Sequence, residues 1–220
     1  MDFNAYPDAE MMMMRVADDL AGEISKCLSG HDHVSIAVPG GSTPGPIFDT
    51  LSGAQLKWER VHVLLTDERR VPADHERSNE RLLRQRLLRD RAAAATFVRL
   101  VPEEGQNAAD LADRLAPELP LSILVLGMGA DMHTASLFPG SPQLEAALAP
   151  NAPPLMEVDA PEGLEPRITL TAPVLRGAMS THVVITGTEK RAALDAARSL
   201  PPESAPIAAV LRDATVHWAP

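Results

Sequence analysis

The sequence predicts an α/β fold in three layers, with a mostly parallel central sheet flanked by helices. Short apolar runs typical of buried strands alternate with segments whose apolar residues follow helical spacing. This alternation favours parallel strands joined by right-handed crossovers. No Ser/Gly-rich linker or block of charge divides the 220 residues, of which 45% are hydrophobic. We therefore expect a single domain over 1–220 with one sizeable core.

The first half of the chain is expected to contain three helices and three strands. Val16, Leu20 and Ile24 follow helical spacing and predict the first helix, over 8–28. The other expected elements are strands over 34–38, 61–66 and 96–100, a short helix around 47–51 and a helix from 78 to about 91. The first two strands end in a glycine-rich loop and a charged loop, which are candidate ligand-binding segments.

The second half continues the alternation. Pro117 and Pro120 end a helix that is predicted over 107–115. The next expected elements are a strand over 121–126, a helical stretch to 148, a long ordered loop or small flap over 149–166 and a strand over 167–171. A short helix over 172–178, a strand over 182–186, a helix to about 200 and terminal strands over 207–211 and 215–218 complete the chain.

Composition excludes several classes of protein. The chain has 30 acidic and 20 basic residues and a formal net charge of -10, which would repel nucleic acid. An anionic substrate would need a local cluster of positive groups. The single cysteine, Cys27, excludes an intrachain disulfide and a metal–thiolate cluster. No apolar run approaches the roughly 20 residues that span a bilayer. We expect a cytoplasmic protein, a monomer or small homo-oligomer, with neither nucleic-acid nor membrane partners.

The segment after the strand over 121–126 concentrates groups that can do chemistry. Gly127 and Gly129 allow backbone angles closed to other residues and let a ligand approach the main chain. His133 can exchange a proton near neutral pH, and Asp131 could orient it or hold a substrate hydroxyl. The alternative is a glycine turn followed by a histidine on a surface loop, because short glycine patterns often occur by chance.

The loop after the strand over 34–38 is predicted to bind an anion. Gly40 and Gly41 expose main-chain N–H groups. Ser42 or Thr43 can cap the following helix, whose first position suits Pro44. Such a helix start attracts phosphate, although the spacing matches neither the Walker loop nor the dinucleotide fingerprint. An ordinary capped turn would explain the same residues, and the two adjacent glycines favour the phosphate.

Two more charged segments are expected at the same edge of the sheet. Asp67 could take a substrate hydroxyl, and Arg69 or Arg70 could supply positive charge, unless this segment is simply a solvated loop. Lys190 begins a helix, against the dipole preference, and a bound anion would remove that conflict. An exposed lysine is the alternative. Because ligands bind at the carboxyl ends of parallel strands, the convergence of these segments predicts acid–base chemistry on a small phosphorylated substrate.

The motifs, in their order along the chain, resemble those of a known family. They occupy 39–44, 66–69 with 71–72 and 78–79, 127–140, 166–169, and 187 with 190. In this order they look like 6-phosphogluconolactonases, which belong with the glucosamine-6-phosphate deaminase/isomerase group. The Thr-Ala-Ser-Leu-Phe-Pro sequence over 134–139 is similar to the lactonase form, whereas the deaminases carry an Ile-Ala-Phe-Asn-Glu-Pro type of sequence.

The resemblance implies a Rossmann-like fold and a carboxylic ester hydrolase. Its reaction would be hydrolysis of a sugar-phosphate lactone, 6-phospho-D-glucono-1,5-lactone, to 6-phosphogluconate in the oxidative pentose phosphate pathway, without metal or organic cofactor. His133 would be the general base, Asp131 and Asp67 would orient substrate hydroxyls or the imidazole, and Arg69 would stabilise the oxyanion. The phosphate would be held by Gly40, Gly41, Ser42, Thr43, Arg167 and Lys190.

Two positions raise structural questions. Arg167 begins a predicted strand, so a parallel strand would place it at the wrong edge of the sheet. Either this strand is antiparallel or the side chain reaches the site from the preceding loop. Met132 stands where the family usually has glycine, and a requirement for positive φ there would strain the methionine.

Two alternative functions follow from the same residues. An amino-sugar-phosphate deaminase/isomerase would use the same phosphate site with Asp67 as the base. A non-catalytic sugar-phosphate sensor is the other alternative, with Met132 as the sign of lost catalysis.

Overall fold

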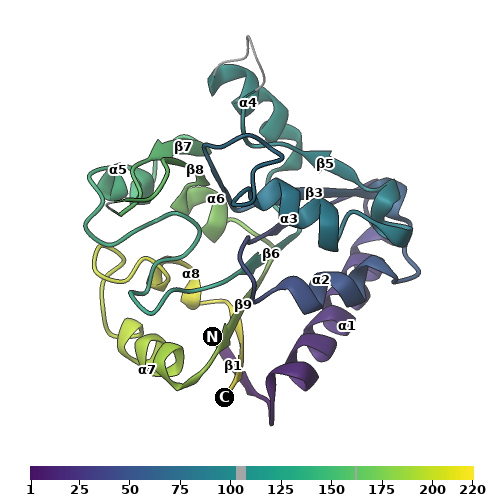
Figure 1. Ribbon diagram of the computed structural model, residues 1–220, viewed down its shortest axis with the longest axis horizontal. Helices are drawn as coiled ribbons and strands as arrows, with labels where there is room; N and C mark the ends of the chain where they lie inside the picture. Colours follow the sequence, from purple (N-terminus) through teal and green to yellow (C-terminus); the bar gives the residue numbers. More distant parts are fainter. Residues whose placement is uncertain (103–107, 162) are drawn as a thin grey trace.

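A seven-stranded parallel sheet forms the centre of the protein, as a computed structural model shows (Figure 1). The structure describes residues 1–102, 108–161 and 163–220. The strand order is β1-β10-β9-β6-β2-β3-β5, and every neighbouring pair is parallel. The strands are β1 (Asp2–Ala5), β2 (Val34–Val38), β3 (Val61–Leu65), β5 (Thr96–Val98), β6 (Ile123–Leu126), β9 (Ser180–Thr186) and β10 (Thr215–Ala219). The predicted α/β class with a mostly parallel sheet is confirmed.

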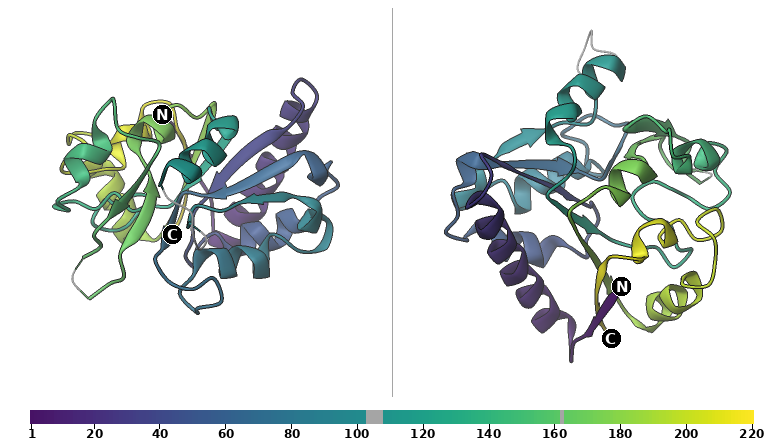
Figure 2. Two further views of the ribbon diagram at one scale, coloured as in Figure 1. Left: turned by 90° about the horizontal axis from the view of Figure 1, so that it is seen from above. Right: turned by 180° about the vertical axis from the view of Figure 1, so that it is seen from behind.

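Helices cover both faces of this sheet (Figures 1 and 2). On one face α1 packs against α2, and α2 against α3; on the other α6 contacts α5 and α8. The α-helices are α1 (Ala9–Leu28), α2 (Gly45–Ser52), α3 (Asn79–Arg86), α4 (Ala108–Leu115), α5 (Leu144–Leu148), α6 (Ala172–Arg176), α7 (Thr188–Ala197) and α8 (Ala208–Leu211). Short 3-10 helices occupy Trp58–Arg60, Asp90–Ala94 and Ala116–Glu118. No helix in the described ranges has the length and apolar character needed to cross a membrane.

In helix α1, the apolar residues at helical spacing form the face that packs against the sheet. Asp8 caps α1 by accepting a hydrogen bond from the Met11 N–H at 2.8 Å. Val16, Leu20 and Ile24, one helical turn apart, are fully buried. The facing strand β2 is buried along its whole length, because helices cover both faces of a central parallel strand.

A second, smaller sheet forms where the sequence predicted loops. Its order is β4 (Asp67–Arg69), β8 (Arg167–Leu170) and β7 (Leu155–Val158), and its pairs are antiparallel. The 67–70 segment was expected to be a loop and 149–166 a loop or flap, so both expectations missed a strand. Of the two placements considered for Arg167, the antiparallel one is right: Arg167 lies opposite Arg69.

Other expectations were wrong in detail. The apolar run over 207–211, predicted as a strand, forms helix α8, because short apolar runs fit either state. Strand β1 was missed, since its four residues are mostly exposed and carry little pattern. Helix α3 ends at Arg86 rather than near 91. Of the helix predicted over 107–115, residue 107 lies outside the described residues.

A chain of buried and partly buried polar groups connects Tyr6, which precedes helix α1, with strands β9 and β10 and with α1 itself. The Tyr6 hydroxyl lies 2.9 Å from His217 Nδ1, and His217 Nε2 lies 3.0 Å from His182 Nδ1. His182 Nε2 in turn lies 3.2 Å from the Glu23 carboxylate. Burial, and secondarily the charge of His182, lowers the pKa of His217 from 6.5 to about 4. His217 is therefore neutral in the folded protein at neutral pH.

The lowered pKa of His217 predicts that the free energy of unfolding decreases in acid. Because the folded state binds the His217 proton more weakly than the unfolded chain, its contribution to stability is complete above about pH 6.5 and is lost as the pH falls toward about 4. At about 1.4 kcal/mol per tenfold change in proton affinity, the loss amounts to roughly 3 kcal/mol. Urea denaturation at pH 7 and pH 4.5 measures it. His217→Gln should flatten this dependence and the exposed His31→Gln should not; equal slopes in both variants would refute the assignment.

Candidate functional site

A cleft of about 440 Å³ opens at the carboxyl ends of β2, β6 and β9, beside strand β4. Its lining includes nine of the ten predicted site residues: Gly40, Gly41, Ser42, Thr43, Asp67, Arg69, His133, Arg167 and Lys190. The tenth, Asp131, contacts His133 rather than the cleft itself. This edge of the sheet is where parallel α/β folds bind ligands.

His133 and Asp131 form a hydrogen-bonded pair in the loop after β6. The Asp131 carboxylate lies 2.5 Å from His133 Nδ1 and also accepts the His133 backbone N–H at 3.2 Å. The imidazole packs on the Phe138 ring, with 4.9 Å between ring centroids. Its Nε2 has no hydrogen-bond partner among the described residues. A carboxylate on Nδ1 places the neutral imidazole's proton there and leaves the Nε2 lone pair available as a base.

Position 129 requires glycine, because the side chains of Asp131 and His133 lie close to its backbone. A Cβ atom at Gly129 would lie 2.2 Å from His133 Nδ1 and 2.3 Å from Asp131 Oδ1. By contrast, a Cβ at Gly127 would meet nothing within 4 Å. The protein itself leaves room for a side chain at the first glycine of the motif, which lines the cleft, whereas the second glycine makes room for the histidine and its partner.

Gly129→Ala is accordingly expected to lower the turnover number by about tenfold or more, because the added methyl group displaces the imidazole. The control variant Gly22→Ala, in α1 and away from the cleft, where a Cβ would also meet nothing within 4 Å, should stay within about twofold of the wild type. Steady-state kinetics of both variants on the substrate proposed below provide the comparison. Equal activities of the two variants would show that the position of His133 does not limit turnover.

Met132 adopts the backbone conformation that the sequence comparison raised as a concern. Its φ is 68°, in the left-handed region where residues with a Cβ are strained by about 1–2 kcal/mol. The Met132 carbonyl accepts a hydrogen bond from the Ile207 N–H at 3.1 Å, which helps to hold the turn. The flanking Asp131 and His133 remain paired, so the methionine is accommodated without separating them.

The loop after β2 differs from the predicted capped turn. Neither Ser42 nor Thr43 caps α2; the N-cap is Pro44, which makes no side-chain hydrogen bond. Gly41 has a φ of 86°, a conformation that favours glycine. The Ser42 and Thr43 hydroxyls make no side-chain hydrogen bond within the described part of the chain, and both residues line the cleft. They are therefore available to a ligand together with the start of α2.

Positive side chains surround the cleft. Arg69 and Arg167 are cross-strand partners in β4 and β8, where like charges repel unless an anion compensates them. Burial lowers the pKa of Arg167; Arg69 and Arg77 lower it further, while Asp67 and Glu165 oppose the change. In the described structure the buried Nε of Arg69 has no hydrogen-bond partner.

Lys190 adds to this charge from another element. Lys190 lies in the first turn of α7, after Gly187, and lines the same cleft. Residues from three elements, β4, β8 and α7, therefore give the cleft the local positive charge that the overall negative balance lacks.

Asp67 is held by neighbouring hydroxyl groups rather than by the imidazole. It is buried, and its two oxygens accept hydrogen bonds from Thr66 Oγ1 at 3.1 Å and Ser136 Oγ at 2.6 Å. It faces the cleft, where its remaining lone pairs are placed for a substrate hydroxyl. Asp131, not Asp67, orients His133.

Among the residues that line the cleft without a predicted role are one amide, one aromatic and one cationic side chain: Asn79, Phe138 and Arg77. Asn79 was interpreted as part of a helix start and of the family motif, and Phe138 as part of a motif; neither was given a role in the site, yet both line the cleft. Arg77 also lines it, from the loop between β4 and α3. Only the Ser78-Asn79 pair in the family motif could have drawn attention to this segment.

One group of described residues has the spacing of a metal site, but it lies elsewhere. His33, His62 and Glu118 gather at the amino ends of β2, β3 and β6, the opposite edge from the cleft. The two imidazoles stack, with centroids 4.5 Å apart and planes inclined by 22°, and His62 Nδ1 lies 2.8 Å from Glu118. Nearly parallel rings do not aim their lone pairs at one point, so this arrangement suits a hydrogen bond between His62 and Glu118 better than metal coordination.

Comparisons with known proteins identify the family of this chain. Residues 7–218 match the family model for glucosamine-6-phosphate isomerases/6-phosphogluconolactonase. A 6-phosphogluconolactonase of Rhizobium meliloti (strain 1021) is 40% identical, with 100% of this chain and 99% of that protein covered. One of Pseudomonas aeruginosa is 41% identical, with 93% and 89% covered.

A solved structure extends the likeness to three dimensions. A 6-phosphogluconolactonase from Shewanella baltica OS155 superposes with a TM-score of 0.94 at 30% identity, covering 100% of this chain and 98% of that one. Since the family model matches nearly the whole chain and relatives exceed 30% identity over their full length, this chain belongs to the glucosamine-6-phosphate isomerase/6-phosphogluconolactonase family.

Proposed function

We propose that this protein hydrolyses 6-phospho-D-glucono-1,5-lactone to 6-phospho-D-gluconate, as a step of the oxidative pentose phosphate pathway. The observation that carries the proposal is the pairing of His133 with Asp131 at the wall of a cationic cleft. One end of that cleft is suited to a phosphate and the other holds a base. The names of the relatives support the same substrate.

His133 is the general base of the proposed reaction. Its Nε2 removes a proton from a water molecule as the water oxygen attacks the lactone carbonyl carbon. The resulting imidazolium, stabilised by Asp131, returns this proton to the ring oxygen as the C–O bond breaks. Arg69 is placed to stabilise the charge that develops on the carbonyl oxygen, since it lines the cleft and its Nε lacks a partner among the described residues.

The phosphate binds at the opposite side of the reacting carbonyl. The N–H groups and hydroxyls of 40–43 surround it at the start of α2, and Lys190 and Arg167 supply charge. Asp67 orients the sugar through a hydroxyl. No step requires a metal or an organic cofactor.

The two alternatives are less well supported. A deaminase would use Asp67 as its base, but both oxygens of this carboxylate already accept hydrogen bonds from hydroxyl groups. A sensor was suggested by Met132, yet the Asp131–His133 pair beside it is intact. Both observations favour the lactonase.

Parallel assays on two substrates test the choice between the enzymes. The lactonase proposal predicts hydrolysis of freshly generated 6-phosphogluconolactone above the spontaneous rate and no ammonia from glucosamine 6-phosphate. Ammonia release without lactone turnover would reverse the assignment.

We also propose a cytoplasmic monomer or small homo-oligomer. The exposed large apolar side chains that the structure describes are Met11, Met14, Leu164, Met179 and Leu200. They come from four separate segments, since only the first two share a helix, and they form no contiguous stretch of the chain that would mark an assembly surface. Cell fractionation and light scattering test these two points.

A further inference from the structure

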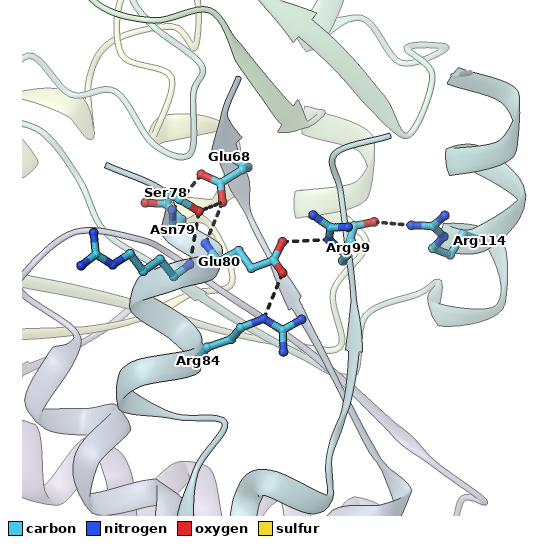
Figure 3. Close-up of polar contacts among 8 residues, drawn as sticks. Glu68, Ser78, Asn79, Glu80, Arg84, Arg99 and Arg114 are labelled. Carbon is cyan, nitrogen blue, oxygen red and sulfur yellow. Dashed lines mark hydrogen bonds and ion pairs between the residues drawn. The ribbon is translucent and has the colours of Figure 1, made fainter. Parts of the chain in front are cut away.

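A buried carboxylate lies directly behind the cleft. Glu68 is the middle residue of β4, between Asp67 and Arg69, and only 3% of its surface is exposed. Figure 3 shows it facing the start of α3. It lines no part of the cleft and takes no part in the proposed reaction.

Four donors converge on the two oxygens of Glu68. Oε1 accepts the backbone N–H groups of Arg69 at 2.7 Å and Asn79 at 2.8 Å. Oε2 accepts the Glu80 N–H at 2.7 Å and the Ser78 hydroxyl at 3.1 Å. Two of these donors are free N–H groups of the first turn of α3, where the helix dipole favours negative charge. Glu68 therefore anchors α3 to β4 across the intervening loop.

Asn79 connects the Glu68 carboxylate to the residues that line the cleft. Its side-chain amide donates to the Asp67 carbonyl oxygen at 2.9 Å. Its Oδ1 lies against the phosphate loop, so closely that a Cβ on Gly40 would be 2.0 Å away. The backbone of Asn79 is bound to Glu68, while its side chain contacts both the loop and the residue that faces the substrate.

We propose that Glu68 is a positioning residue for the phosphate loop and for Asp67 and Arg69. The Glu68 carboxylate holds the backbone of Asn79, and the Asn79 side chain in turn holds the backbone of 40–43 in place. The same carboxylate also accepts the Arg69 N–H. Glu68 acts through these neighbours and touches no reacting atom. The identity of the ligand whose binding it supports rests on the function proposed above.

Glu80, the residue after Asn79, provides a matched control in the same network. Glu80 is also buried, at 6% exposure, but its carboxylate pairs with Arg84 Nε at 3.0 Å and Arg99 Nε at 2.8 Å (Figure 3). None of these three residues lines the cleft. Loss of the Glu80 charge should therefore weaken the fold without moving the phosphate loop.

Glu68→Gln and Glu80→Gln form the test pair. Each keeps the size of the side chain, but at position 68 the amide NH₂ must face donors that need an acceptor. We expect Glu68→Gln to weaken binding of 6-phosphogluconate about tenfold and to raise hydrogen–deuterium exchange in 39–44, measured without ligand. Glu80→Gln should lower the melting temperature while leaving affinity within about twofold and exchange in 39–44 unchanged.

The outcomes separate this inference from the proposed function. Wild-type affinity and exchange in Glu68→Gln, or equal losses in Glu80→Gln, would overturn the positioning role even if the wild type hydrolyses the lactone. If the wild type neither hydrolyses nor binds these ligands, the exchange data alone decide the inference. Should Glu68→Gln not fold, Asn79→Ala breaks the same connection, and unchanged exchange in 39–44 of that variant would equally overturn the role.

Discussion

Replacing His133 by alanine is expected to lower kcat for the lactone by about 10²- to 10⁴-fold, the usual range for loss of a general base. Binding of 6-phosphogluconate should change by less than about threefold, because the phosphate contacts come from other elements. The split between kcat and affinity is what distinguishes a base from a binding residue. Stopped-flow pH-indicator kinetics, corrected for spontaneous hydrolysis, and calorimetry measure the two quantities.

Two further variants make the His133 result specific. Asp131→Asn keeps the shape of the partner but removes the charge that stabilises the imidazolium, so it should reduce kcat less than His133→Ala does. His31→Ala removes an exposed histidine that lies outside the cleft and should have no effect. Near-normal turnover by His133→Ala would show that another group activates the water.

Removal of the two cations assigned to the phosphate should mainly affect binding. We expect Lys190→Ala and Arg167→Ala each to raise KM by about 10- to 100-fold, since a charge-assisted hydrogen bond contributes about 1.5–3 kcal/mol. The kcat should fall less. Arg167 is buried and bonds to the Glu165 carbonyl oxygen at 3.2 Å, so circular dichroism of its variant should accompany the kinetics to show that it remains folded.

The neighbouring Arg191 provides the control for Lys190. It stacks on the Phe3 ring, 3.9 Å from the ring centroid, and pairs with Asp195 instead of facing the cleft. Arg191→Ala should leave KM unchanged. A second control is the ligand: gluconolactone without its phosphate should bind the wild type and the Lys190→Ala variant equally weakly. If Lys190→Ala keeps a wild-type KM for the phosphorylated substrate, the phosphate lies elsewhere.

The parts of the fold that could be predicted are those encoded locally. Strands β2, β3 and β6 are nearly continuous apolar runs, and β9 contains the apolar run 183–185; in a parallel sheet such runs are buried on both faces. The prediction for 207–211, which forms α8, was wrong because this run is too short to show a period. Strand β1 was not predicted because its pairing partner, β10, lies at the other end of the chain.

The candidate site shows the same division. Asp131 and His133 are two residues apart, and their proximity follows from the loop itself. The pairing of Arg69 with Arg167 depends on an antiparallel sheet formed by segments about a hundred residues apart, which no local pattern announces. The connection from Glu68 through Asn79 to Gly40 likewise exists only after β4 and α3 have packed together.

The most direct measurement is the rate at which the wild-type protein removes freshly generated 6-phosphogluconolactone, with the spontaneous rate subtracted and 6-phosphogluconate binding measured on the same sample. The proposed lactonase activity predicts saturable acceleration that 6-phosphogluconate inhibits competitively. Binding of 6-phosphogluconate without any acceleration would contradict it, and would show that a cleft with this histidine, carboxylate and phosphate loop holds a sugar phosphate without hydrolysing it.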